Sequence, residues 1–174
     1  TPTLTLQAGL VCVGTSDNSS YVFSIPESIT TVTSQLTDNA GNIVSSTSSF
    51  ENIVVYQGTY LTKTFTVDGS LDQRFILENS FIDTSTIVVK VSGVSDNSEK
   101  EYSKVDNILN ITDTSEVYLI QEVTDERYEL LFGDGVFGKK LENDSVITVS
   151  YITTDGVEGN GPSAFTYAGS VVSS

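Results

Sequence analysis

The sequence predicts an all-β fold of two small sandwich-like or barrel-like domains, with short antiparallel strands and very little helix. Apolar and polar residues alternate over short stretches, which is typical of strands with one buried face. These stretches recur about every eight to twelve residues, and clusters of Gly, Asn, Asp and Ser, which favour turns, separate them. Residues 106–109 are the best candidate for a helical turn, and no longer stretch has the 3.6-residue period of a helix.

Each strand is predicted from one such stretch, as in residues 86–91, where Ile87, Val89 and Val91 share one face. Residues 117–132 are predicted as a hairpin, and 146–152 as a third strand antiparallel to it. Residues 83–85 and 95–100 are predicted as a turn and a surface loop. A hairpin loop is predicted at 38–42; its return arm begins at Ile43 and leads into a loop or exposed strand at 45–49. A last short strand is predicted around Phe165 and Tyr167. The other predicted strands are 3–6, 10–13, 21–25, 29–32, 53–56, 60–67, 73–77, 86–91, 102–105, 117–123, 127–132 and 146–152.

The chain is long enough for two small β domains. We place the first at residues 1–59 and the second at 60–174. In the alternative division the second domain is an insertion, and residues 160–174 return to complete the first. Because the sequence contains no methionine, we expect it to be a fragment of a longer protein.

The composition excludes several classes of function. A net charge of −15 and a pI near 4.1 argue against nucleic acid or an anionic membrane as partner, because both attract basic surfaces. The absence of histidine excludes Ser-His-Asp and Cys-His catalysis and histidine metal ligands. Cys12 is the only cysteine, so it has no partner for an internal disulfide. We therefore predict no enzyme activity and no cofactor.

Two carboxylate pairs, Asp113 with Glu116 and Asp125 with Glu126, leave a glycosidase as a formal alternative. They lie in polar stretches between strands, where Asp is common as a turn residue, so we interpret them as structural. Calcium bound by Asp134 with Asp125 or Glu129 is the remaining metal alternative. No D-x-D-x-D-G loop is present, so we predict no metal site.

A glycine-rich motif, Gly133-Asp134-Gly135-Val136-Phe137-Gly138, follows the predicted strand at 127–132. It matches the G-x-G-x-x-G pattern of dinucleotide-binding proteins, which requires a strand before it and a helix after it. Two lysines, a polar bend and a β-branched stretch follow instead. We therefore interpret the motif as the tight turn of a hairpin that reverses the chain between two strands.

The same region carries a resemblance to a known family. The sequence YELLFGDGVFGKK at 128–140, a strand ending in Tyr151 and the segment GVEGN at 156–160 follow one another in this order. This order resembles that of the baseplate J-like family of contractile-tail phages, and in particular the T-even gene product six type of wedge protein. The Gln7-Ala8-Gly9 turn and the Asp83-Thr84-Ser85 triplet resemble earlier parts of the same module.

The resemblance implies a structural protein of the phage tail baseplate wedge, assembled in the host cytoplasm and present in the virion. It implies assembly with other copies of itself, as a homo-oligomer of the full-length parent, and with other wedge proteins, namely gene products seven, twenty-five and fifty-three. It also implies a rearrangement during sheath contraction. The alternative class is an extracellular adhesin or carbohydrate-binding β-sandwich, which shares the acidic, Ser/Thr-rich composition.

The candidate interaction surface comes from the residues themselves. Val136 and Phe137 are apolar and stand beside two lysines in an otherwise acidic chain. An equally weighted alternative is that both side chains fold back onto the sheet. The candidate residues are Gly133, Asp134, Gly135, Val136, Phe137, Gly138, Lys139 and Lys140.

Overall fold

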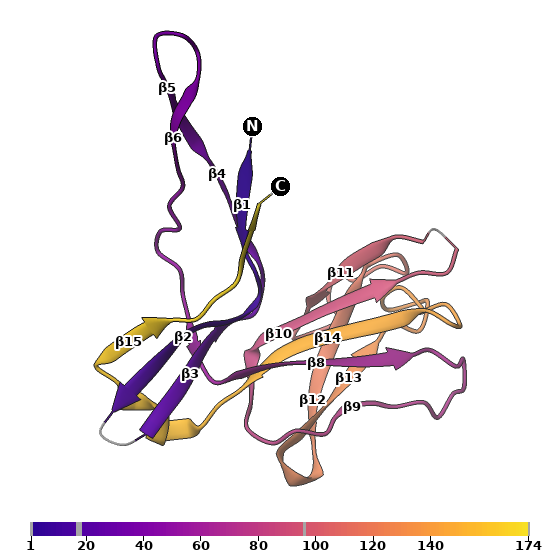
Figure 1. Cartoon of the computed structure of the whole chain (residues 1–174). Helices are drawn as coiled ribbons and strands as arrows, with labels where there is room; N and C mark the ends of the chain where they lie inside the picture. Colours follow the sequence, from indigo (N-terminus) through magenta and orange to yellow (C-terminus); the bar gives the residue numbers. More distant parts are fainter. Residues whose placement is uncertain (1, 17–18, 96, 174) are drawn as a thin grey trace. The chain divides into compact units, whose positions relative to one another are not determined.

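The computed structural model describes residues 2–16, 19–95 and 97–173. Within these ranges the regular structure consists of β-strands and two short 3₁₀ segments, η1 (Thr124–Glu126) and η2 (Gly156–Asn160). The all-β prediction is therefore confirmed. In the same ranges no helix has the length and apolar character needed to cross a membrane. Two compact units make up the chain, a first unit of residues up to Tyr60 and from Thr154 onward, and a second unit of residues 61–153 (Figure 1).

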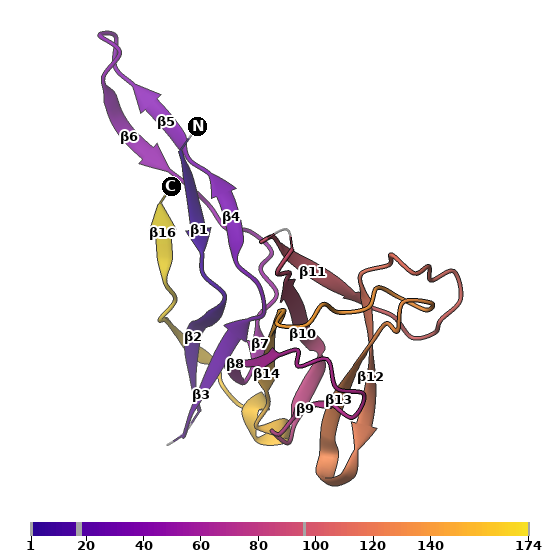
Figure 2. The same ribbon diagram turned by 90° about the vertical axis from the view of Figure 1, so that its right-hand side faces the viewer.

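The first unit combines two small sheets and a hairpin. One sheet has the order β15-β2-β3-β7, the other has the order β16-β1-β4, and β5 pairs with β6. Figure 2 shows the β5–β6 hairpin extending away from the two sheets of this unit. The strands are β1 (Thr3–Leu6), β2 (Gly9–Ser16), β3 (Ser19–Ile25), β4 (Ile29–Val32), β5 (Ser34–Thr37), β6 (Ile43–Thr47), β7 (Tyr56–Gln57), β15 (Ala164–Tyr167) and β16 (Val171–Ser173).

A small core holds the first unit together. Leu6, Val11 and Ile25 are buried, and three partly buried residues, Ile29, Phe50 and Ile53, pack against them. The end of the chain returns to this unit, since β15 pairs antiparallel with β2 and β16 pairs antiparallel with β1. The last short strand that the sequence predicts around Phe165 and Tyr167 corresponds to β15.

The second unit is one curved seven-stranded sheet with the order β8-β14-β10-β11-β12-β13-β9. The strand β10 pairs antiparallel with both β14 and β11, and β13 pairs antiparallel with both β12 and β9, whereas β11 and β12 are parallel. The strands are β8 (Thr59–Thr66), β9 (Phe75–Leu77), β10 (Ile82–Ser92), β11 (Glu99–Lys104), β12 (Val117–Val123), β13 (Arg127–Phe132) and β14 (Val146–Thr153). The first two residues of β8 belong to the first unit.

The two edge strands of this sheet come together, so the sheet curls into a nearly closed barrel. Phe65 on β8 and Phe75 on β9 stand at opposite ends of the strand order, yet their rings meet edge to face with centroids 5.6 Å apart. Beyond β8, the Gln73 side chain donates a hydrogen bond to the Thr66 carbonyl at 2.7 Å and accepts one from the Asp68 amide at 2.9 Å. A single sheet can bring its edges this close only by curving back on itself.

The interior of this barrel is the main hydrophobic core of the chain. Ile87, Val89 and Val91 are buried together, as the alternation in β10 predicts. Leu130 on β13 lies directly between Ile120 on β12 and Phe75 on β9. The other buried members are Val67, Leu77, Ile82, Tyr102, Tyr118, Ile147, Val149 and Tyr151.

The predicted pairing of the strand at 146–152 is wrong. This strand, β14, lies between β8 and β10 and does not extend the β12–β13 hairpin. The free edge of β13 is occupied by β9 instead. Alternation specifies which face of a strand is buried, but it does not specify the neighbouring strand. The motif at 133–138 is therefore a loop that leaves one strand pair and leads to a distant one.

Several local predictions also need correction. Residues 83–85 lie within β10, at a bulge where the Thr86 hydroxyl donates to the Asp83 carbonyl and accepts from the Ile152 amide. Residues 106–109 contain only bends and turns, and strand β16 was not predicted. Several strand limits also differ. The strands β2, β3 and β10 are longer than predicted, β7 is confined to Tyr56–Gln57, β9 begins at Phe75 and β11 begins at Glu99.

Candidate functional site

The 133–140 loop, which comprises the eight candidate interaction residues, closes on itself directly after β13. Gly133 and Lys140 form an isolated bridge at the two ends of the loop. Between them, the backbone of Gly138 lies so close to Gly133 that a Cβ atom on Gly133 would overlap its carbonyl group. Glycine is needed at position 133 because two segments of backbone touch there.

The Asp134 carboxylate fixes the tip of the loop from inside. Its Oδ1 accepts hydrogen bonds from the amides of Val136, at 2.8 Å, and Phe137, at 2.9 Å. These amide hydrogen bonds, that of Phe137 first, lower the pKa of Asp134. Gly135 and Gly138 have φ angles of +94° and +91°, which favour glycine, and the Gly135 amide donates to the Gly138 carbonyl at 3.1 Å. The sequence interpretation of the glycines as turn residues is thus correct for this loop.

A second loop, at residues 112–116, holds the 133–140 loop from outside. The Gly138 amide donates to the Thr112 carbonyl at 3.0 Å, and the Lys139 amide donates to the Ser115 carbonyl at 2.8 Å. Both contacts use backbone groups, so they leave no signal in the amino-acid sequence. The tip of the loop is therefore held in one conformation by internal and external hydrogen bonds.

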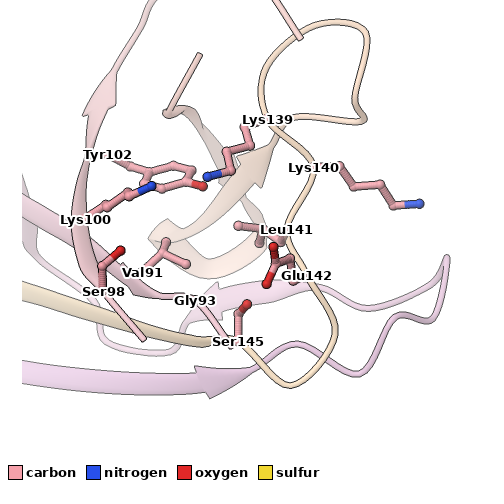
Figure 3. Close-up of a pocket in the computed structure, with 10 residues that line it drawn as sticks. All are labelled: Val91, Gly93, Ser98, Lys100, Tyr102, Lys139, Lys140, Leu141, Glu142 and Ser145. Carbon is pink, nitrogen blue, oxygen red and sulfur yellow. The ribbon is translucent and has the colours of Figure 1, made fainter. Parts of the chain in front are cut away.

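Two lysines of this region form salt bridges with the same carboxylate, that of Glu116. The ammonium groups of Lys139 and Lys100 lie 3.0 Å and 3.3 Å from Glu116 Oε1, and the hydrogen bond from Lys139 is the main reason why the pKa of Glu116 is lowered. Figure 3 shows both lysines directed toward Tyr102, at a small pocket of about 30 Å³, whereas Lys140 extends away from it. Lys140 is therefore the cation of the loop that points outward.

The apolar tip of the loop remains accessible. Val136 is 64% exposed and Phe137 is 51% exposed, so these two side chains do not fold back onto the sheet. A backbone held by hydrogen bonds to Asp134 and to residues 112–115 presents them. The loop presents a valine, a phenylalanine and a lysine together on a fixed scaffold.

An ion pair between a buried carboxylate and a half-exposed arginine supports the strand that leads into the loop. Glu129 is 7% exposed, and its two carboxylate oxygens accept hydrogen bonds from Arg74 Nε at 2.7 Å and Nη2 at 2.6 Å. The bidentate contact lowers the pKa of Glu129 against the opposing effect of burial. The sequence analysis missed this pair because 55 residues separate its two members.

We expect Arg74→Ala to lower the free energy of unfolding by about 1–2 kcal/mol at pH 7, because it leaves the buried Glu129 carboxylate without its partner. The half-exposed arginine side chain keeps this value below that of a fully buried pair. The pKa of Glu129 is lowered in the folded protein, so its contribution is present above the unfolded pKa of about 4.3 and is lost as the pH falls through the folded pKa.

Urea unfolding of wild type and variant at pH 7 and pH 3 measures this difference. The gap between the two proteins should shrink at the lower pH, because the contribution of the ion pair is lost as the Glu129 carboxylate takes up a proton. Arg127→Ala is the matched control, because the carboxylates of Glu78 and Asp125 lie 3.4 Å from Arg127 and are exposed, and its shortest contact, at 3.1 Å, is with the Thr124 carbonyl. An equal loss for Arg74→Ala at both pH values would mean that Arg74 acts through packing alone.

Several of the acidic residues considered for catalysis or calcium binding are engaged in other contacts. Glu116 binds two lysines, Glu129 binds Arg74 and Asp134 accepts two loop amides. Asp125 and Glu126 form the tight turn between β12 and β13, with φ angles of +64° and +56°. Among the described residues, no group of three Asp, Glu or Cys side chains is placed to hold a metal ion.

Comparison with known protein families identifies a family to which the second unit is similar. A family model described as the third domain of the bacteriophage baseplate wedge protein gp6 matches residues 61–159, more than half of the 174 residues. The chain belongs to this family. The gp6 match begins where the second unit begins, and it includes β9 to β14 and the whole 133–140 loop. A search of curated proteins found no match.

Membership in the gp6 family confirms the resemblance that the sequence analysis identified in residues 128–160. It identifies the chain as part of a structural protein of the bacteriophage baseplate, which is a component of the virion tail. The β-barrel with the 133–140 loop is the part of the molecule to which this assignment applies directly.

Proposed function

We propose that this chain is an assembly module of the baseplate wedge that binds neighbouring proteins through the 133–140 loop. The observation that carries the proposal is the pair of exposed apolar side chains, Val136 and Phe137, on a backbone fixed by Asp134 and by residues 112–115. A rigid apolar loop loses little conformational entropy on binding, so it is well suited to an interface.

The proposed partners are other copies of this chain in its parent protein and other baseplate wedge proteins, and the module acts without catalysis. The absence of histidine and the occupied carboxylates support a purely structural role. Nucleic acid and membrane are not proposed as partners, because a net charge of −15 repels both. We further propose that the module is assembled into the baseplate in the host cytoplasm and moves with the wedge when the sheath contracts.

The division of the chain supports a related proposal about its domains. We propose that the second unit, residues 61–153, is a β domain inserted into the first unit. The ladders between β15 and β2 and between β16 and β1 support this, because they join the two ends of the chain within the first unit. This is the alternative division considered from the sequence, with the inserted segment ending near Thr153.

The double substitution Val136→Ser with Phe137→Ser tests the interface. It should weaken binding to wedge proteins at least about ten-fold, because exposed apolar anchors dominate interface energies. It should change the free energy of unfolding by less than about 0.5 kcal/mol, because both side chains are more than half exposed. Sedimentation velocity of mixtures with purified wedge proteins measures the binding, and circular dichroism confirms that the β structure is retained.

The matched control is Phe81→Ser with Val157→Ser, which removes one exposed phenylalanine and one exposed valine elsewhere in the chain. Their exposures are 66% and 85%. Equal weakening by the two double variants would attribute the effect to general surface hydrophobicity. Undiminished binding by the loop variant would exclude the 133–140 loop as the contact.

A further inference from the structure

The β5–β6 hairpin of the first unit is an arm without a core of its own. We call residues 33–49 the arm, and Figure 2 shows it projecting beyond the two sheets of its unit. Every residue of β5 and β6 is exposed, and the apolar side chains Leu36, Ile43 and Val44 are exposed by 64%, 57% and 59%. A two-stranded hairpin alone is only marginally stable in water, so such an arm is stabilised when a further strand pairs with it.

The turn at the tip fixes the hairpin. Asp38 Oδ1 accepts hydrogen bonds from the amides of Ala40, at 2.9 Å, and Asn42, at 2.8 Å, and the Asn42 side-chain amide donates to Oδ2 at 3.0 Å. These hydrogen bonds, that of the Asn42 side chain first, lower the pKa of Asp38. The turn therefore sets the register of β5 and β6 without help from a core.

Two neighbours flank the chain at Thr33, which joins β4 to β5. The Thr33 amide donates to the carbonyl of Pro2, directly before β1, at 2.9 Å. The hydroxyl of Ser48, directly after β6, donates to the Thr33 hydroxyl at 2.8 Å. Because Pro2 occupies one side of Thr33, β6 and its continuation lie on the other side.

The side of β5 that faces away from β6 is an edge in line with β1. Backbone groups of successive strand residues point alternately to the two sides, so those of Gln35 and Thr37 point to the side that Thr33 uses for Pro2. In the described part of the chain, β5 pairs only with β6. The backbone groups of Gln35 and Thr37 therefore continue the edge that β4 presents to β1, with no described strand beside them.

Charge does not protect this edge from other polypeptides. Edge strands are often shielded by charged side chains, which prevent pairing with another protein. The arm contains a single charged residue, Asp38, although the whole chain has a net charge of −15, and the carboxylate of Asp38 is used by the turn. The edge of β5 is therefore open to the addition of a strand.

We propose that an extended strand of a different baseplate wedge protein pairs antiparallel with β5 on this edge, in line with β1. A row of backbone amides and carbonyls at strand spacing is satisfied by another extended backbone, and alternate side chains of the added strand contact Val32 and Leu36, which share one face. The partner at this edge is a different protein, because the arm carries no cation to offset the repulsion between two copies. This second contact lies in the first unit and goes beyond the proposed role of the 133–140 loop.

Amide hydrogen exchange of the whole chain tests the added strand directly. In the free chain the amides of Gln35 and Thr37 should exchange rapidly, because no described strand lies beside them. Purified wedge proteins are added one at a time at saturating concentration, and one of them should slow both amides at least about ten-fold. Unchanged exchange with every wedge protein would overturn the inference. The same slowing in the concentrated chain alone would assign the edge to a second copy and would also overturn it.

Gln35→Pro removes one outward amide from the edge, and Gln35→Ala is its control, because it shortens the side chain and keeps the amide. Proline is tolerated on an edge strand where the missing N–H faces solvent, so the ladder with β6 should remain. Backbone chemical shifts of Leu36 and Ser45, which are paired in that ladder, verify this. Binding to the wedge protein should weaken at least about ten-fold for Gln35→Pro and less than about three-fold for Gln35→Ala.

Normal binding by a Gln35→Pro protein with an intact ladder would contradict strand addition at this edge. If proline opens the ladder, the exchange of the Gln35 and Thr37 amides in the wild-type complex decides alone. Slow exchange of both amides in that complex supports the added strand, and unchanged exchange overturns it.

The loop variant Val136→Ser with Phe137→Ser separates this contact from the proposed function. Loss of binding by the loop variant, with the Gln35 and Thr37 amides unprotected in the wild-type complex, would overturn the strand addition and retain the role of the 133–140 loop. Normal binding by the loop variant, together with weakened binding by Gln35→Pro, would overturn the role of the loop and retain the contact at β5.

Discussion

Leu130→Ala should lower the free energy of unfolding by about 3 kcal/mol, roughly a hundred-fold in the unfolding equilibrium constant. Leu130 is 1% exposed and lies on β13 between its cross-strand neighbours Ile120 and Phe75. Removing its side chain leaves a cavity that the rigid ladders on both sides prevent from collapsing. This is the largest effect expected for a single side chain considered in this protein.

Its neighbour on the same strand provides the control. Leu131 points to the opposite face and is 37% exposed, so Leu131→Ala should cost less than about 1 kcal/mol. Urea unfolding followed by circular dichroism measures both values, with unchanged m-values indicating that the unfolding transition is the same. Similar losses for the two variants would contradict the assignment of Leu130 to the core and Leu131 to the surface.

The contrast between these two leucines also shows what the sequence reveals. Alternation assigns Leu130 to the buried face, because the period of a strand is a local property. The position of β13 between β12 and β9 is not local, and the sequence predicted β14 as its neighbour instead. Ladder pairing depends on contacts between segments that are distant in the chain, as in the pairing of Leu77 on β9 with Tyr128 on β13.

The candidate site also has features that the sequence indicates and features that it does not. Its glycines and Asp134 indicate a tight turn, because glycine tolerates positive φ and aspartate binds nearby backbone amides. The external support of the loop cannot be predicted, since Thr112 and Ser115 contribute only their carbonyl groups. The Arg74–Glu129 pair is similarly hidden, because two isolated charges 55 residues apart carry no pairing signal.

The conformation of the loop itself gives the second large effect. Gly133→Ala should lower the free energy of unfolding by about 2–3 kcal/mol, because the new methyl group meets the backbone of Gly138, which cannot rotate away. Gly135→Ala is the control within the same loop. Position 135 has space for a methyl group, with Lys140 Cβ at 3.6 Å, so its φ of +94° alone should cost about 1 kcal/mol.

Amide hydrogen exchange links this stability difference to the interface. The amides of Val136 and Phe137 are held by Asp134, so Gly133→Ala should accelerate their exchange more than Gly135→Ala does. Because an ordered loop binds with a smaller entropic cost, Gly133→Ala should also weaken partner binding even though Val136 and Phe137 are retained. A Gly133→Ala protein with slow exchange and normal binding would show that the loop tolerates the methyl group, and that the exposed side chains alone determine the contact.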